Sequence, residues 1–469
     1  MGSVDPEQWA RDEFGHARLG HALRVRALVR TATGCARRPG GKVTSVFNLS
    51  ADRESAYRLI ENEAIDPEAV MAAAHQAAAR RCGEARFAYV PVDKTSLNIT
   101  DRAQEKGFGM IGTNASGATG LNVLSALAVT PDGVPQGLAY QRYWARPRKQ
   151  KSSRRAKKKA PLGERESHLW QEAMASVAAT FAEQTNGCRP WFQIDREGDV
   201  SGALAWAVDG GHLLTVRAQR NRRVTVEDQS KTYVRDQMEV LPVLGVYQVH
   251  KAPRPGQSER TATVEVRAAT MTLDVPVDET QKRRRDLPIN VVLVSEPHPP
   301  AGEEALDWLL FTTAPVASFE EAVAVAFGYA QRWRIEEFHR AWKTGTCNVE
   351  ESQARSPKHL IRWAVLLASV AVRVVRLAYL ARALPDAPAS IEFSKDEMLA
   401  IKMVVKPRNP PTNPTLGQVI GWLASIGGYG GPKSAGGPPG PIVLTRGLEH
   451  IQPMVTAIVG LRALKPDQW

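Results

Sequence analysis

Apolar and basic positions recur at helical spacing over the first part of the chain. A stretch rich in arginine is followed by the equally helical ESAYRLIENEAIDPEAVMAAAHQAAARR. The recurring apolar residues of the first stretch are Phe14, Leu19, Leu23, Val25, Leu28 and Val29. This pattern predicts a helical domain over residues 1–75. Two interpretations stay open for it, a small bundle with a solvated basic face or a DNA-binding domain.

Beyond Arg86 the pattern changes to short apolar runs that are separated by Gly, Pro and Asn turns. Three strands are predicted first, in FAYVPVDKTSLNIT, GLNVLSALAVTP and PQGLAYQRYWARP. A helix (ESHLWQEAMASVAATFAEQ), a strand (PWFQID), a helical segment near GALAWAV and a strand (HLLTVRA) follow. This order is typical of an α/β fold with a mixed sheet, which we assign to residues 76–384.

Two regions depart from that order. Residues 218–288 are charged and strand-prone, with the runs RAQRNRR and QKRRRD at their edges, and we interpret them as a β-rich insertion. Strands resume in LPINVVLVSE and LDWLLFTTAPV. Residues 385–469 are rich in Pro and Gly, and Gly427–Pro441 is predicted to be a flexible loop between helical pieces of a C-terminal domain.

The charge balance favours a polyanionic partner. The chain of 469 residues has 61 Lys and Arg against 49 Asp and Glu, a net charge of +12, and basic surfaces gain affinity by releasing counterions from phosphates. The run Arg146–Lys159 is either a solvated loop or a loop that contacts DNA, and we favour the second interpretation.

Membrane and disulfide-rich classes are disfavoured. The longest apolar run, Ala364–Ala381, is interrupted by Arg373 and Arg376, so we expect a mostly buried helix and no membrane partner. The N-terminus has no secretory pattern. Four scattered cysteines without C-x-x-C spacing predict neither a disulfide framework nor structural zinc, and suit a reducing, cytoplasmic compartment.

Two aspartates stand where apolar strands turn polar, Asp93 in VPVDKTSLNIT and Asp195 in WFQID. A single Asp at a strand end usually marks a turn or a helix cap. Two of them on strands that are neighbours in a sheet, joined by a carboxylate from a helix, would form an oxygen-rich pocket that suits Mg²⁺. Such a site supports in-line phosphoryl transfer.

The third carboxylate is expected in YAQRWRIEEFHRAWKTG, residues 329–345. On a single helix with 100° per residue, one face would carry Tyr329, Arg332, Glu336 and Lys343. The opposite face would pack through Ile335, Phe338 and Trp342. An i,i+4 salt bridge explains Arg332 and Glu336, but it does not explain a tyrosine in the same register.

This segment resembles the Y-R-E-K signature of bacterial cut-and-paste DDE transposases of the insertion-sequence-four group, and is similar to that of their Tn-five-like members. DKTSL at Asp93, DREGD at Asp195, LDWLLFTTAPV and SAYRLI match the family in the same order, so the resemblance covers nearly the whole chain. The sequence departs from the family pattern at His21, where an Asp is frequent, and at Ser201, where a His is common.

The resemblance implies a ribonuclease-H-like fold and roles for single residues. Asp93, Asp195 and Glu336 would be the catalytic carboxylates that hold two Mg²⁺ ions, or Mn²⁺ in their place. The expected DNA contacts are Tyr329, Arg332, Lys343, Arg217 and Arg340. Trp308 would receive a flipped base during hairpin formation, although its place in LDWLLF taken alone favours a core tryptophan.

The family also implies partners and a reaction. Its members nick transposon ends, form hairpins, reopen them and join the ends to target DNA, working as a homodimer on double-stranded DNA in the bacterial cytoplasm, at the nucleoid. The segment Gly417–Leu464 matches the region that dimerises. The alternatives are a catalytically silent, transposase-derived DNA-binding protein or inhibitor, and a structure-specific nuclease that cuts without joining.

Overall fold

The computed structural model describes residues 5–101, 105–112, 117–146, 168–225, 231–251, 259–276, 283–432 and 437–463. Of the basic run Arg146–Lys159, only Arg146 lies within these ranges. Part of the predicted loop Gly427–Pro441, residues 433–436, also lies outside them.

The N-terminal region is helical, as its periodicity predicts. Asp5 caps the first helix and Asp66 the last, each with Pro at the first helical position, and the His21 ring accepts from the Leu23 amide as the cap of the second. The helices are α1 (Pro6–Phe14), α2 (Ala22–Arg37), α3 (Val43–Val46), α4 (Ser50–Glu61) and α5 (Pro67–Arg81). The predicted domain boundary at residue 75 falls inside α5.

The central sheet begins with the predicted order of strands and helices, plus one short strand, β2, that was not predicted. Its elements are β1 (Phe87–Asn98), β2 (Gly109–Met110), β3 (Thr119–Val129), β4 (Pro135–Trp144), α7 (His168–Gln184), β5 (Arg189–Ile194), α8 (Ser201–Asp209) and β6 (Leu213–Arg217). β3 pairs antiparallel with both β1 and β4, while β5 pairs parallel with β1 and with β6. The fold class is therefore mixed α/β with a mixed sheet.

Alternate residues of β1 enter two different hydrophobic cores, as expected for a strand covered on both faces. Ala88, Val90 and Val92 belong to the core formed with α7 and α8. Tyr89 and Leu97 belong to the core on the opposite face, which includes the helices that follow β12. Because Asp93 has the same parity as Tyr89 and Leu97, it lies on that second face.

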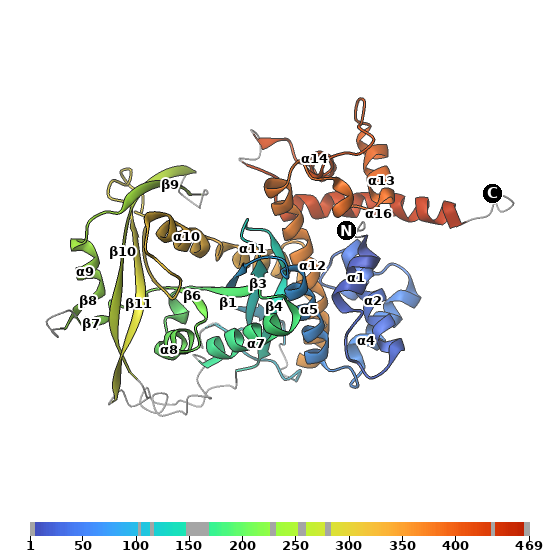
Figure 1. Cartoon of the computed structure of the whole chain (residues 1–469). Coiled ribbons are helices and arrows are strands. Elements are labelled where there is room, and N and C mark those ends of the chain that lie inside the picture. Colours follow the sequence, from blue (N-terminus) through green and yellow to red (C-terminus); the bar gives the residue numbers. More distant parts are fainter. Residues whose placement is uncertain are drawn as a thin grey trace.

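The region predicted as a β-rich insertion extends the same sheet. Its elements are β7 (Arg223–Thr225), β8 (Lys231–Tyr233), α9 (Val234–Val240), β9 (Gly245–Lys251) and β10 (Arg260–Pro276). β11 (Arg284–Ser295) crosses the predicted end of the insertion at residue 288, and β12 (Asp307–Thr312) follows it. β12 pairs with β6 on one side and with β11 on the other. Within the described residues, the result is one sheet of 12 strands, whose extension lies at the left of Figure 1.

The helices after β12 cover the second face and form the C-terminal region. They are α10 (Phe319–Ala330), α11 (Trp333–Lys343), α12 (Pro357–Ala383), α13 (Lys395–Val405), α14 (Leu416–Ile426) and α16 (Pro441–Ala463). α12 runs between the N-terminal helices and the sheet and also contacts α14 and α16 (Figure 1).

α12 confirms the prediction of a buried apolar helix. Among the described residues it is the one helix long and apolar enough to cross a membrane, and 89% of that apolar stretch is buried inside the protein. Its two interrupting arginines have partners. The Arg373 guanidinium lies 5.8 Å from the Trp9 ring centroid, and Arg376 Nη2 donates to Glu392 at 2.9 Å. A core helix explains these partners, because a lipid-facing surface would not provide them.

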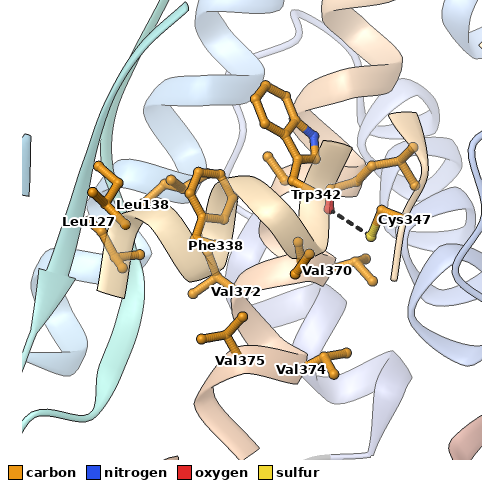
Figure 2. Packing of buried hydrophobic residues seen from close by; sticks show 14 of the residues in the cluster. Leu127, Leu138, Phe338, Trp342, Cys347, Val370, Val372, Val374 and Val375 are labelled. Atoms are coloured by element: carbon orange, nitrogen blue, oxygen red, sulfur yellow. Dashed lines mark hydrogen bonds between the residues drawn. The ribbon is translucent and has the colours of Figure 1, made fainter. Parts of the chain in front are cut away.

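The packing face of the signature segment agrees with its sequence pattern. Ile335, Phe338 and Trp342 are fully buried. The rings of Phe338 and Trp342 are stacked with centroids 5.6 Å apart, and the Trp342 indole N–H donates to the Ala364 carbonyl at 3.0 Å. Figure 2 shows this face of α11 packed between the sheet residue Leu127 and the valines of α12.

Candidate active site

The parallel pairing of β1 and β5 brings the two predicted aspartates together. Val92 is opposite Ile194 in the register, so Asp93 and Asp195 follow a paired position on neighbouring strands. One detail of the prediction is wrong, because Asp93 is not at the end of its strand. β5 stops at Ile194, but β1 continues to Asn98 by pairing with β3, where Asp93 is opposite Ser125.

The signature segment is not a single helix, which corrects the predicted four-residue face. α10 ends at Ala330 and α11 begins at Trp333, so Tyr329 and Glu336 lie on different helices. The break arises where hydrogen bonding tightens to the i→i−3 pattern: the Arg332 amide donates to Tyr329 and the Ile335 amide to Arg332. Gln331 and Arg332 turn their side chains inward at this point and are 3% and 7% exposed.

One face of α11 lies over β1. Glu336, His339 and Lys343 have i, i+3 and i+7 spacing and share this face. His339 Nδ1 is 3.8 Å from Asp93 Oδ2, and Lys343 Nζ is 3.3 Å from Thr95 Oγ1. Glu336 therefore projects from the face that meets the strand of Asp93.

Electrostatics couple the three carboxylates. Burial and the neighbouring charge of Asp195 raise the pKa of Asp93 to about 7; Glu336 adds to this rise and the Arg332 guanidinium opposes it. Arg332 Nη2 donates to Glu336 Oε1 at 2.6 Å. Arg332 is thus the cation that partly neutralises the carboxylates in this structure.

The three carboxylates match the chemistry of a magnesium site in donor type. All donors are hard oxygens, and the pKa of Asp93 is raised first by burial and then by the neighbouring charge of Asp195. In the part of the chain that the structure describes, no three His, Cys, Asp or Glu side chains are already placed to hold a metal ion. To bind a metal ion, the Glu336 carboxylate would have to give up its hydrogen bond with Arg332.

His339 is a component of the site to which the sequence pattern assigned no role. Burial, together with the charges of Lys343 and Arg332, lowers its pKa to about 3, so the ring is neutral and its contact with Asp93 is not an ion pair. Its Nε2 is buried and has no hydrogen-bond partner among the described residues. The sequence could have indicated His339, because its i+3 spacing from Glu336 puts both residues on one face of a helix.

The predicted DNA contacts divide into buried and accessible groups. Tyr329 is 3% exposed, and its ring lies edge-on to Trp308 with centroids 5.3 Å apart. Trp308 itself is half-buried, and Arg217 Nη2 donates to the carbonyl of Asp307 beside it at 2.8 Å. Arg340 lies on an exposed side of α11. The structure brings Tyr329, Trp308 and Arg217 together, and their roles in DNA contact stay predictions.

A hollow of about 250 Å³ that the sequence pattern did not predict adjoins this group. Its lining includes four arginines, Arg196, Arg217, Arg220 and Arg235, and one carboxylate, Asp307. Arg235 Nη2 donates to Asp307 at 3.0 Å. Because Asp307 is paired with Arg235, the other three arginines give the hollow an excess of positive charge. Asp195 and Arg217 follow the paired residues Ile194 and Val216 on neighbouring parallel strands, so the hollow that Arg217 lines lies next to the strand end that carries Asp195.

A second basic concavity lies among the N-terminal helices. This groove has a volume of about 1380 Å³ and is lined by residues of α1, α2 and α5 and by Phe47, Asn48 and Asp52. Seven arginines line it, Arg11, Arg26, Arg30, Arg37, Arg38, Arg80 and Arg81, against three acidic residues. Such an excess of arginine suits a phosphate backbone.

Comparison with protein families finds a match at each end of the chain. Residues 6–65 match the family described as transposase DNA-binding, and residues 369–464 match the Transposase Tn5 dimerisation domain. The two matches support a Tn5-like transposase that binds DNA and forms dimers. The dimerisation match begins inside α12, upstream of both the predicted segment Gly417–Leu464 and the predicted domain start at residue 385.

Proposed function

We propose that the protein is a DDE transposase of the insertion-sequence-four group. It would cut transposon ends through a hairpin intermediate and join them to target DNA. The observation that carries the proposal is the parallel pairing of β1 with β5, which sets Asp93 beside Asp195 under the helix that bears Glu336. This arrangement lies between a DNA-binding match and a dimerisation match.

The strand order supports a ribonuclease-H-like core. β4, β3 and β1 are successive antiparallel neighbours, and β5 and β6 continue the sheet in parallel from β1. Helices α7 and α8 connect β4 to β5 and β5 to β6. Asp93 on the central strand β1 faces α11, the helix that carries Glu336.

In the proposed chemistry, Asp93, Asp195 and Glu336 hold two Mg²⁺ ions, with Mn²⁺ able to replace them. When bound, the ions activate water and stabilise the attacking and leaving oxygens of an in-line displacement. The residues of the chain position the DNA: Arg332 and Lys343 contact the phosphates near the cleaved bond. Arg332 is already placed beside Glu336, and Lys343 lies over β1.

The reaction sequence needs no covalent protein intermediate. Hydrolysis of one strand frees a 3′-hydroxyl, whose attack on the opposite phosphodiester closes a hairpin and releases the flanking DNA. A second hydrolysis opens the hairpin, and the 3′-hydroxyls then attack target phosphodiesters. Trp308 would stack on the base that is flipped out at the hairpin, while Tyr329, Arg217 and Arg340 hold the backbone. We propose that the reaction takes place in the bacterial cytoplasm, at the nucleoid.

The decisive experiment uses a plasmid that carries candidate ends. Incubation with protein and Mg²⁺ should yield hairpin-ended excised DNA and then insertions. Asp93→Ala should bind the same DNA without cutting it. DNA binding without cleavage by the wild-type protein would refute the enzymatic proposal, and nicks without joining would favour a structure-specific nuclease.

The second candidate is a catalytically silent, transposase-derived DNA-binding protein or inhibitor. The Arg332–Glu336 pair favours it, because an arginine at 2.6 Å competes with a metal ion for the third carboxylate. Arg332→Ala discriminates between the two. In a transposase it weakens cleavage by removing a phosphate contact, whereas a silent protein stays inactive with and without Arg332.

A further inference from the structure

The second aspartate of DREGD is not placed to join the carboxylate site. Asp199 has a fully buried side chain and pairs with Arg222, whose side chain is 11% exposed. Arg222 Nε donates to Asp199 Oδ1 at 3.0 Å, and its Nη2 donates to the same carboxylate and, at 3.0 Å, to the Asp199 carbonyl. Arg222 Nη1 completes the set by donating to Ser201 Oγ at 3.0 Å.

This pair joins two segments that carry candidate functional residues. On one side is the turn after Asp195, a 3₁₀ segment over Arg196–Gly198 in which the Glu197 amide donates to Asp195 Oδ1 at 2.9 Å. On the other side is the loop between β6 and β7, whose Gln219 amide donates to Asp199 Oδ2 at 2.8 Å. Asp199 thus binds the loop both through a backbone amide and through Arg222.

The loop is also fixed from the insertion. The Arg235 amide donates to Asn221 Oδ1 at 3.0 Å, and the Val234 amide donates to the Arg222 carbonyl at 2.9 Å. The arginines of the hollow therefore come from the Asp195 turn (Arg196), the strand end and loop (Arg217, Arg220) and α9 (Arg235). Asp199 and Arg222 lie where the first two of these segments meet.

A buried ion pair is weak support for a purely stabilising role, because desolvation cancels much of the attraction, but its directed hydrogen bonds fix geometry. We propose that Asp199 and Arg222 are positioning residues, which hold the four-arginine hollow against the Asp195 turn so that a DNA backbone phosphate is held beside the carboxylates. The inference rests on the proposed function, and it adds two residues that do not touch DNA themselves.

The experiment compares Asp199→Asn and Arg222→Lys with a matched control, Asp274→Asn. Asp274 is also a buried aspartate with basic partners, since Lys231 Nζ donates to it at 2.7 Å and Arg284 Nε at 2.6 Å, but it lies in the β-rich extension. Two quantities are measured on end DNA: the single-turnover cleavage rate in Mg²⁺, and the dependence of binding affinity on salt in EDTA. Melting temperatures report stability.

Asp199→Asn and Arg222→Lys should each lower the cleavage rate by about 10-fold or more, since a displaced phosphate clamp misaligns the reacting bond. Both should also lower the slope of log affinity against log salt by about 1 to 2, because one or two phosphate contacts are lost. Asp274→Asn should lower the melting temperature comparably and change neither quantity.

The outcomes separate the inference from the proposed function. If the wild-type protein cleaves and the two variants behave like Asp274→Asn, the positioning role is refuted and the transposase proposal stands. If the wild-type protein binds without cleaving, the transposase proposal fails. The salt slopes in EDTA then decide the positioning role alone, and unchanged slopes would overturn it. Arg222→Lys retains a positive charge, so it provides this answer even if Asp199→Asn does not fold.

Discussion

The Tyr379 hydroxyl of α12 donates a hydrogen bond to the Glu337 carboxylate of α11. The same hydroxyl accepts from Arg334 Nη1 at 2.9 Å, and the Arg334 guanidinium lies 3.8 Å from the Tyr379 ring centroid. Glu337 therefore faces the helix on which the dimerisation match begins, whereas Glu336 lies on the face over β1. The two adjacent glutamates therefore have different surroundings.

Exchanging either glutamate for glutamine should separate their roles. Glu336→Gln should reduce end cleavage in Mg²⁺ by at least about 100-fold, because an amide is a much poorer ligand for a hard cation. Glu337→Gln is the matched control and should retain cleavage within about 3-fold, with a small loss of stability from the weakened bond to Tyr379. The assay is single-turnover cleavage of labelled end DNA. Equal losses in the two variants would contradict the assignment.

Metal binding should be visible in thermal unfolding. Burial and the charge of Asp195 raise the pKa of Asp93 to about 7, so the charged Asp93 destabilises the metal-free protein at neutral pH. In EDTA, Asp93→Asn should raise the melting temperature by about 2–4 °C. Added Mg²⁺ should stabilise the wild-type protein and have little effect on the variant. Equal Mg²⁺ responses of the two proteins would place the ion elsewhere.

Trp308 should affect one stage of the reaction selectively. Its half-buried ring contacts the Tyr329 ring edge-on. Stacking of a base on an aromatic ring contributes about 1–3 kcal/mol to the binding free energy. Trp308→Ala should therefore reduce hairpin formation by about 10-fold or more while first-strand nicking continues, and Trp308→Phe should retain most of both. Denaturing gels resolve nicked from hairpin products. A parallel loss of nicking and hairpin formation would indicate a structural role instead.

The stable packing of the N-terminal helices should depend on one arginine of α12, Arg362. Arg362 is 4% exposed and donates to the carbonyls of Ile60 and Ile65, both at 2.8 Å. Arg362→Ala leaves two buried carbonyls without this donor and should cost about 2–4 kcal/mol of unfolding free energy. Arg355→Ala is the control, because Arg355 is 82% exposed and should contribute less than about 1 kcal/mol. Urea unfolding measures both, and similar costs would contradict the anchoring role of Arg362.

The elements that the sequence predicts well are those whose pattern is dictated locally. β1, β3, β4 and β5 carry apolar runs bounded by turn residues, and the observed strands agree with the predicted ones closely. The proximity of Asp93 and Asp195 follows from parallel pairing, which the order of strands and helices made plausible in advance. Both predictions need only strand periodicity and short connections.

Other features depend on tertiary contacts that the pattern does not encode. The break between α10 and α11 contains no Gly or Pro, and it forms where the side chains of Gln331 and Arg332 are buried. The ion pair of Asp199 is another example, since its partner Arg222 lies 23 residues away, in the charged run that marks the edge of the predicted insertion. Buried charges are paired by the fold, so their partners are seldom visible in the sequence.

The pairing of β6 with β12 has an evolutionary consequence. The chain leaves the core at Arg217 and returns at Leu310, which is opposite Arg217 in the same ladder. Because this ladder fixes both ends of the excursion, lengthening or shortening the excursion alters loop-closure entropy only slowly and leaves β1 and β5 undisturbed. The part of the extension beyond Arg235 can therefore change in length or sequence while Arg222 still pairs with Asp199, so a lineage could alter it without rebuilding the carboxylate site.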